Sequence, residues 1–161
     1  MKIDKSEILA LMIEQLRADL ATLEQAVAIA RDTATHSDCL GSSKYETMGL
    51  EASYLAQGQG TRLLEVERSL EYFKRLTLVE PSSPVISLSS LVLLNNVEGE
   101  CQLLWLAPEA GGLKIQYGEL IITVITPRSP LGRALIGKAE GDGFEITIAG
   151  KDRSYEVSAV C

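Results

Sequence analysis

The residue types that can do chemistry gather in one short polar stretch, residues 36–43. His36 stands beside Ser37 and Asp38, a combination that acid–base catalysis uses, and Cys39 follows. As the alternative, His36 is only a solvent-facing side chain. Cys39 at an exposed tip could serve as a redox sensor, and its alternative is a small loop residue. Because His36 is the one histidine of the chain, a histidine-based zinc site or a Ser-His-Asp triad is not expected. The sequence therefore predicts no catalytic residue.

Length, charge and cysteine usage narrow the class of protein. The 161 residues allow one ordinary domain or two small ones. A net charge of −7 and a pI of about 4.8 argue against a general nucleic-acid binder, which needs a basic excess to neutralise phosphates. The three cysteines lie far apart, as is typical of a reducing compartment. No apolar run reaches the roughly 18 residues of a membrane span, and the first residues make a poor signal peptide, so we expect a cytoplasmic protein without a membrane partner.

Two helical patterns must position the polar stretch. Apolar or small residues recur at spacings of four and three, the heptad pattern of a coiled coil. The first seam is Leu9, Ile13, Leu16, Leu20, Leu23, Val27, Ala30 and Ala34, and the second is Ala52, Ala56, Gln59, Leu63, Val66, Leu70, Phe73 and Thr77. The pattern predicts an antiparallel helical hairpin over residues 1–79, with residues 36–43 at its tip. An ordinary helical bundle is the alternative, but no third helix of similar length follows.

The middle of the second helix is its weak point. Gly58 and Gly60 flank the polar Gln59 within the seam. Each glycine in a helix costs about 1 kcal/mol relative to alanine, so a kink is expected and a true break is the alternative.

Beyond the prolines and serines of residues 81–84 the period changes to that of β-strands. Strands are expected at residues 85–94, 101–106, 120–125, 144–148 and 155–160, with hairpin loops at 95–99 and 149–152. One short helix interrupts them, because Ser129 is a good N-cap, Pro130 fits the first helical position and Gly137 ends the helix. The fold class is therefore α+β, with the helical hairpin followed by a small sheet domain over residues 80–161.

The short helix and the residues after it carry a family resemblance. Residues 129–142 read Ser-Pro-Leu-Gly-Arg-Ala-Leu-Ile-Gly-Lys-Ala-Glu-Gly-Asp, and Tyr155-Glu156-Val157 stand near the end. This order of cap, proline, helix, glycine stop and Gly-Asp turn resembles the Gre family of bacterial transcription elongation factors. The resemblance covers essentially the whole chain and implies a coiled-coil hairpin followed by an FKBP-like domain.

The resemblance also implies a partner, RNA polymerase. In the family, the FKBP-like domain docks at the rim of the polymerase secondary channel and the hairpin reaches down the channel to the active centre. Ser129 and Pro130 open the helix with the strongest match, so they are the expected polymerase-binding residues. As the alternative, they only cap that helix.

The tip is where the sequence departs from the family. In cleavage-stimulating members, acidic tip residues help to hold a catalytic magnesium ion and to position a water. Aligning the family pattern on Tyr45 puts Asp38 at the position of the aspartate. The same alignment puts Gly41 where a glutamate is usual and Lys44 where another acid is common. Asp38 is therefore the candidate magnesium-positioning residue, and Asp38 and Glu46 are the tip residues expected near the active centre. As the alternative, Asp38 is an ordinary acidic residue of the loop or caps the second helix. The alternative for Glu46 is an acidic residue in the first turn of that helix, where the helix dipole favours negative charge.

These observations predict a monomeric Gre-like regulator that binds RNA polymerase and is not itself an enzyme. Its transcript-cleavage stimulation is expected to be weak or absent. It needs no cofactor of its own, since the magnesium ion belongs to the polymerase, and its contact with DNA and RNA is indirect. A helical-hairpin adaptor for an unrelated partner is the alternative, and an apolar seam on an outer surface would favour it. Prolyl-isomerase activity is not expected, because residues 80–161 offer few aromatic side chains for a pocket.

Overall fold

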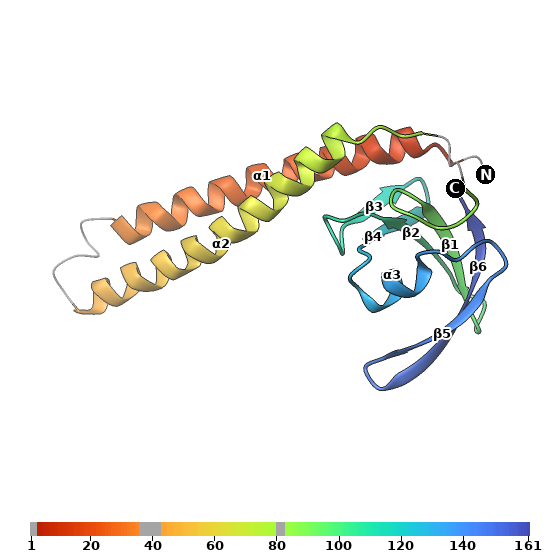
Figure 1. Ribbon diagram of the computed structural model, residues 1–161. Helices are drawn as coiled ribbons and strands as arrows, with labels where there is room; N and C mark the ends of the chain where they lie inside the picture. The colour runs from red at the N-terminus through yellow and green to blue at the C-terminus, as the bar shows by residue number, and fades with distance from the viewer. Residues whose placement is uncertain (1–2, 36–42, 80–82) are drawn as a thin grey trace. The chain divides into compact units, whose positions relative to one another are not determined.

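The computed structural model describes residues 3–35, 43–79 and 83–161, with side chains given for all of these except residues 33–35 and 43–56. The first half consists of two long helices, α1 (Lys5–Thr35) and α2 (Ser43–Arg75). Figure 1 shows them side by side and running in opposite directions. Asp4 caps α1, because its Oδ1 atom accepts a hydrogen bond of 2.9 Å from the backbone N–H of Ser6. The helical pair predicted from the heptad spacing is confirmed.

Burial of the side chains follows the predicted seams from Leu16 onward. The buried seam residues are Leu16, Val27 and Ala30 on α1 and Val66, Leu70 and Phe73 on α2, and Leu20, Leu23 and Leu63 between them are half-buried. Near the start of α1 the prediction is wrong by one position: Ile8 and Met12 are buried, whereas Leu9 and Ile13 are only half-buried. At the other end, α2 stops at Arg75 and Thr77 is exposed.

The helix around the two glycines is continuous. α2 runs from Ser43 to Arg75 without interruption at Gly58 or Gly60, so the predicted alternative of a true break is wrong. Gln59 lies between them with its Oε1 atom buried and without a hydrogen-bond partner among the described residues. The two glycines cost about 1 kcal/mol each relative to alanine, which makes this turn the weak part of the described helix pair.

The second half is a six-stranded mixed sheet with one short helix, α3 (Pro130–Leu135). The strands are β1 (Leu91–Asn96), β2 (Cys101–Leu106), β3 (Lys114–Tyr117), β4 (Leu120–Ile125), β5 (Gly143–Ile148) and β6 (Lys151–Val160). Their order in the sheet is β3-β4-β2-β1-β6-β5. β2 and β4 pair in parallel, and every other neighbouring pair is antiparallel. The α+β fold class is confirmed.

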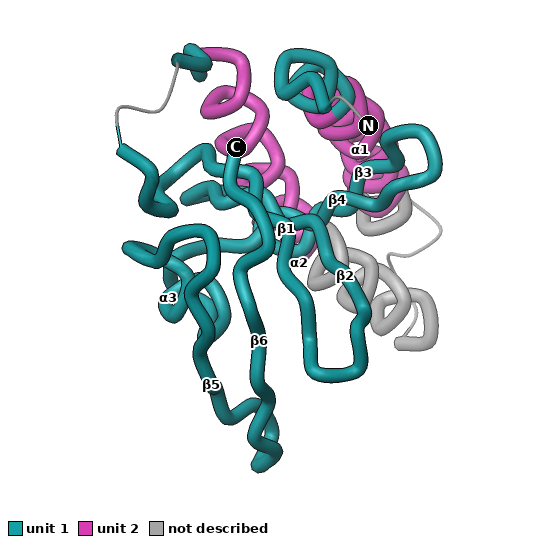
Figure 2. Tube along the Cα trace, turned by 90° about the vertical axis from the view of Figure 1, so that its right-hand side faces the viewer, with its two compact units in different colours: residues 1–11, 76–161 teal, residues 12–75 magenta. Residues whose placement is uncertain are grey.

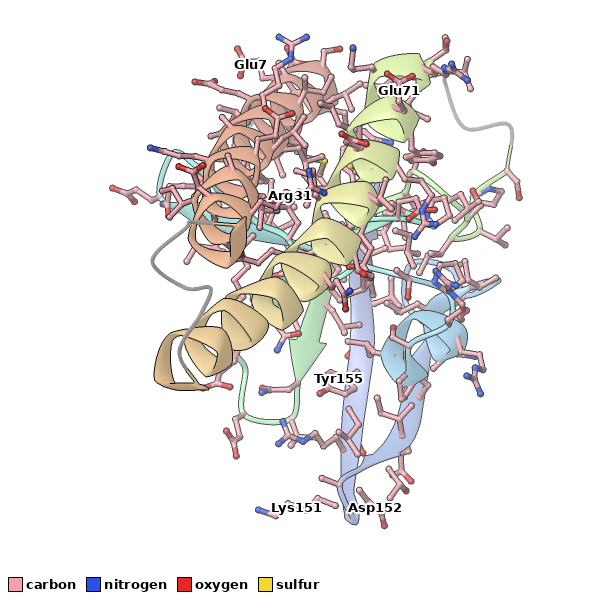
Figure 3. The ribbon with its side chains drawn as sticks, turned by 90° about the vertical axis from the view of Figure 1, so that its left-hand side faces the viewer. Glu7, Arg31, Glu71, Lys151, Asp152 and Tyr155 are labelled. Atoms are coloured by element: carbon pink, nitrogen blue, oxygen red, sulfur yellow. The ribbon has the colours of Figure 1, made fainter. Side chains whose placement is uncertain are left out.

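Two predicted strands are corrected, and one strand was missed. The strand expected at 155–160 begins at Lys151, so the hairpin loop expected at 149–152 contains only Ala149 and Gly150. The strand expected at 85–94 begins only at Leu91, because residues 85–90 hold a single bridge at Val85 and a turn in which Ser89 has a φ of 70°. Strand β3 was not predicted, since it has four residues and only Ile115 is buried among them. The β5–β6 hairpin closes at Ala149 and Gly150 with φ values of 53° and 77°, a type I′ turn whose tip leads into Lys151 and Asp152 (Figure 3).

Both faces of the sheet are buried in its centre. One face packs against α3. The buried cluster there comprises Val92, Leu94, Leu104, Leu106, Tyr155 and Val157 of the sheet, Leu135 of α3, and Ile86, which precedes β1. The opposite face contains Leu91, Leu103, Trp105, Ile115, Ile122 and Val124, which are also buried. Cross-strand partners such as Trp105 and Val124 share a face, so the register sets both layers. Each fully buried apolar side chain of this size contributes about 1.5–3 kcal/mol.

The chain divides into two compact units, coloured separately in Figure 2. One unit comprises residues 1–11 and 76–161, and the other comprises residues 12–75. The first residues of α1 thus belong to the unit that contains the sheet. Independent folding of residues 1–79 and 80–161 as domains stays a prediction. None of the helices in the described part of the chain is both long and apolar enough to cross a membrane.

Candidate functional site

The start of α3 is built around the hydroxyl group of Ser129. Ser129 has φ −70° and ψ 154°, the extended backbone of an N-cap residue. Its Oγ atom accepts a hydrogen bond of 3.1 Å from the backbone N–H of Gly132 and donates one of 2.7 Å to the carbonyl oxygen of Thr126. The hydroxyl therefore fixes both the helix end and the turn before it. The cap predicted from the sequence is confirmed, and Pro130 occupies the first helical position.

Gly132 allows the turn and the helix to approach each other. A Cβ atom at this position would lie 2.0 Å from the carbonyl oxygen of Thr126 and 2.9 Å from Ser129 Oγ. No side chain fits there without moving the backbone. The close approach leaves Pro130 exposed at the surface, while Ser129 is half-buried.

Two arginines border the exposed proline. Arg128 and Arg133 are both exposed, on either side of the cap in sequence. The guanidinium of Arg133 donates to the carbonyl oxygen of Arg128 at 3.0 Å, and that of Arg128 donates to the carbonyl oxygen of Pro108 at 3.3 Å. Sequence reasoning did not single them out, although two cations around one cap in a chain of net charge −7 were a visible signal. The arrangement suits an acidic or carbonyl-rich partner surface.

The predicted tip residues are described only in part. Asp38 lies outside the described residues, and Glu46 lies in α2 but its side chain is outside them. Within the described residues, no three His, Cys, Asp or Glu side chains gather as a metal site would require. The metal-positioning role of Asp38 and the tip role of Glu46 therefore stay predictions.

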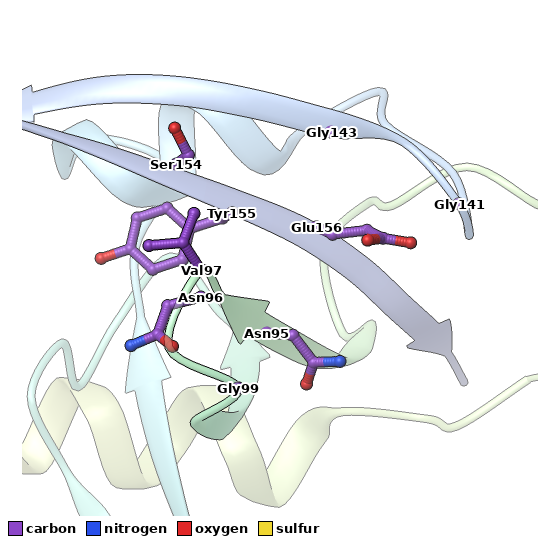
Figure 4. Close-up of a pocket in the computed structure, with 9 residues that line it drawn as sticks. All are labelled: Asn95, Asn96, Val97, Gly99, Gly141, Gly143, Ser154, Tyr155 and Glu156. Carbon is purple, nitrogen blue, oxygen red and sulfur yellow. The ribbon is translucent and has the colours of Figure 1, made fainter.

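A second feature of the sheet is an open cavity of about 560 Å³ at the end of β1, the start of β5 and the middle of β6 (Figure 4). It is lined by Asn95, Asn96, Val97, Gly99, Gly141, Gly143, Ser154, Tyr155 and Glu156. The two asparagines serve the local structure: Asn95 Oδ1 accepts from the thiol of Cys101 at 2.8 Å, and Asn96 Oδ1 accepts from the backbone N–H of Glu98 and of Glu100. The lining offers hydrogen-bonding groups. Its Ser154 hydroxyl donates a hydrogen bond of 3.1 Å to the carboxylate of Glu145 on β5, an exposed contact across the hairpin.

The order of the elements defines the class of protein. The chain is an α+β protein in which a pair of long helices precedes a mixed sheet with one short, capped helix. Residues 118–161, which include β4, α3, β5 and β6, match the family model described as "Transcription elongation factor, GreA/GreB, C-term".

Relatives extend the match to most of the chain. The transcription elongation factor GreA of Cereibacter sphaeroides (strain ATCC 17025 / ATH 2.4.3) is 30% identical over 136 residues, which are 84% of this chain and 79% of the relative. The transcription elongation factor GreA of Acidiphilium cryptum (strain JF-5) is 28% identical over 153 residues, 92% of each chain. This chain belongs to the Gre family of transcription elongation factors.

Solved structures with a similar layout include the transcription factor Gfh1. One such structure is 24% identical, with 94% of this chain and 92% of that chain covered and a TM-score of 0.41. The Gfh1 protein of Thermus thermophilus is 25% identical, with 95% and 94% covered and a TM-score of 0.38.

Proposed function

We propose that this chain binds bacterial RNA polymerase at the secondary channel through the start of α3. The observation that carries the proposal is the exposed Pro130 on a cap that Ser129 and Gly132 hold rigid, within the part of the chain that the family model matches. A rigid, partly apolar protrusion docks with little loss of conformational entropy. The flanking Arg128 and Arg133 add charge-assisted hydrogen bonds to an acidic partner surface.

The helix pair serves as the part that reaches toward the polymerase active centre. Described seam residues such as Val27 on α1 and Val66 on α2 are buried, and others such as Leu20 and Leu63 are half-buried, so most of the seam is covered within the pair. The exposed large apolar side chains of the pair, Ile29 and Leu64, lie outside the seam. This burial favours the polymerase hypothesis over a hairpin adaptor that uses its seam for binding. The protein acts as a monomer, and it contacts DNA and RNA only within the polymerase complex.

Cleavage stimulation is weak or absent, because the tip is short of carboxylates. Asp38 is the one acid near the position where a magnesium ion of the polymerase would be met, and Gly41 takes the place of the usual glutamate. A hard cation that bridges reacting oxygens needs carboxylates both as ligands and to orient water. One carboxylate cannot serve both purposes. The factor then acts by occupying the channel, by competing with cleaving relatives, or by changing pausing and initiation.

The docking part is tested with Pro130→Ala. Loss of the apolar ring at the contact is expected to weaken binding to core RNA polymerase by about tenfold, measured by titration with a labelled factor. Pro84→Ala is the matched control, because Pro84 is also exposed but lies outside α3. Equal affinities of wild type and Pro130→Ala, with an unchanged circular dichroism spectrum, would count against the contact.

The tip part is tested on backtracked complexes. Wild type is expected to stimulate transcript cleavage far less than a standard Gre factor, and Gly41→Glu is expected to raise the rate because it restores the second carboxylate. Asp38→Ala should abolish the remaining activity. Robust cleavage with wild type that persists in Asp38→Ala would overturn this part.

A further inference from the structure

The first turn of α1 is tied to the sheet by the side chain of Lys5. Its Nζ atom donates hydrogen bonds to the backbone carbonyl of Ser89 at 2.5 Å and to that of Cys161 at 3.3 Å. It also lies 5.1 Å from the centroid of the Trp105 ring, within cation–π range. One ammonium group therefore joins the beginning of the chain to a turn, to the last residue and to the centre of the sheet.

Tyr117 makes a second tie from the edge strand β3. Its hydroxyl donates a hydrogen bond of 3.0 Å to the Glu7 carboxylate and accepts one of 3.2 Å from the backbone N–H of Asp4. Both bonds cross more than 100 positions of sequence, so they reflect tertiary structure and not local helix capping. Ile8 follows directly and is fully buried.

The Trp105 ring is the surface on which the Lys5 ammonium lies. The ring is fully buried, and its Nε1 atom has no hydrogen-bond partner among the described residues. A buried indole usually finds an acceptor for its N–H group. Here the contact with a polar group is made at the face of the ring, by the Lys5 ammonium.

We propose that Lys5, Glu7, Trp105 and Tyr117 form a clasp, a set of positioning residues that hold residues 5–11, the root of α1, on the sheet of the same unit, and that this hold is needed for the effect of the hairpin tip on the polymerase. The clasp itself rests on contacts within the sheet-containing unit, and its consequence for the tip rests on the function proposed above. The clasp residues lie outside both the cap of α3 and the tip, so they are additional residues on which the proposed function depends.

The length of α1 amplifies any tilt at its root. The helix continues from Lys5 to Thr35 over 31 residues. Such a helix is about 46 Å long, so a tilt of about 10° at its root moves the far end by about 8 Å. Displacements far smaller than this abolish productive geometry at an active centre. Groups that fix the root of α1 therefore matter for the tip without touching it.

The clasp is tested first by hydrogen exchange on the full chain. Lys5→Met combined with Tyr117→Phe keeps the apolar bulk but removes the charge and the hydroxyl. Amides of residues 8–11 are expected to exchange roughly fivefold faster for each hydrogen bond lost. Lys5→Arg is expected to retain protection, because a guanidinium also stacks on Trp105. The control is Arg62→Ala with Glu65→Ala, which removes an exposed pair of α2 at 3.3 Å. Unchanged protection in Lys5→Met with Tyr117→Phe overturns the clasp.

The positioning role is tested with core RNA polymerase and backtracked complexes. Because wild type is expected to stimulate cleavage only weakly, the effect of the factor is measured as the change in pausing during elongation and, in the Gly41→Glu background, as the change in cleavage rate. The clasp variant is expected to keep its half-saturating concentration within about twofold, since docking uses α3, while the maximal effect shrinks by at least about fivefold. A maximal effect equal to that of wild type, with protection lost, overturns the positioning role. If wild type itself does not bind polymerase, the proposed function fails, and hydrogen exchange alone then decides whether the clasp exists.

Discussion

At the scale of single residues, Gly132 is the glycine at which the surrounding backbone leaves the least space for a Cβ atom. A Cβ atom there would meet the backbone oxygen and carbon of Thr126 at 2.0 and 2.8 Å. Gly132→Ala is expected to destabilise the sheet-containing unit by about 3 kcal/mol, because backbone must shift and the Ser129 cap is lost with it. Urea unfolding followed by tryptophan fluorescence measures this, since Trp105 is the single tryptophan and lies in the sheet.

Gly143 is the matched control for this substitution. A Cβ atom there would lie 3.6 Å from the carbonyl oxygen of Tyr155, an ordinary contact. Gly143→Ala should therefore change the free energy of unfolding by less than about 0.5 kcal/mol. Equal stabilities of the two alanine variants would show that the turn at Thr126 adapts freely.

The cap of α3 was predictable because its signals are local. Ser129, Pro130 and Gly137 lie within nine positions, and each acts on the backbone beside it. The need for glycine at position 132 was not predictable, since it arises from a turn carbonyl brought close by tertiary structure. The clasp was missed for the same reason. Nothing in the sequence relates Lys5 to Trp105 until the sheet places them together.

At the scale of elements, α2 contains two glycines that its packing does not require. A Cβ atom at Gly58 or Gly60 would meet no atom of the described residues within 4 Å, and the helix is continuous through both. Gly58→Ala and Gly60→Ala are each expected to stabilise the helix pair by about 1 kcal/mol, because alanine loses less backbone entropy on folding. Thermal unfolding followed by circular dichroism at 222 nm measures the gain.

Gly118 offers the opposing control. Its φ of 61° places it in the left-handed region, so Gly118→Ala should destabilise the protein although the space around it is open. A decrease in stability from Gly60→Ala would mean that the turn around Gln59 needs a conformation that alanine resists.

The elements also show where periodicity predicts structure and where it does not. The heptad spacing predicts the seam from Leu16 to Phe73 because both helices pack on each other there. It fails at Leu9, since the start of α1 belongs to the sheet-containing unit and buries Ile8 instead. The four residues of β3 are too few to show a period at all.

At the scale of the whole molecule, the two compact units differ in what holds them together. The sheet-containing unit buries both faces of its central strands, whereas residues 12–75 rely on one apolar stripe of a helix pair. Gly58 and Gly60 lower the stability of the second helix of this pair further, by about 1 kcal/mol each relative to alanine. Cooperative units with fewer buried contacts open at lower free energy.

Heating is therefore expected to give two transitions, with residues 12–75 unfolding first. Residues 8–11 should keep their protection through the lower transition, because Lys5 and Tyr117 anchor this turn to the sheet. Hydrogen exchange with mass spectrometry at increasing temperature, alongside calorimetry, separates the two groups of amides. The glycine variants provide the internal check: Gly58→Ala and Gly60→Ala should raise the lower transition by several degrees and leave the upper one in place. A single calorimetric transition would show that the chain unfolds as one cooperative body. Two transitions with protection at residues 8–11 lost in the lower one, together with residues 12–75, would show that the clasp does not hold the root of α1 on the sheet.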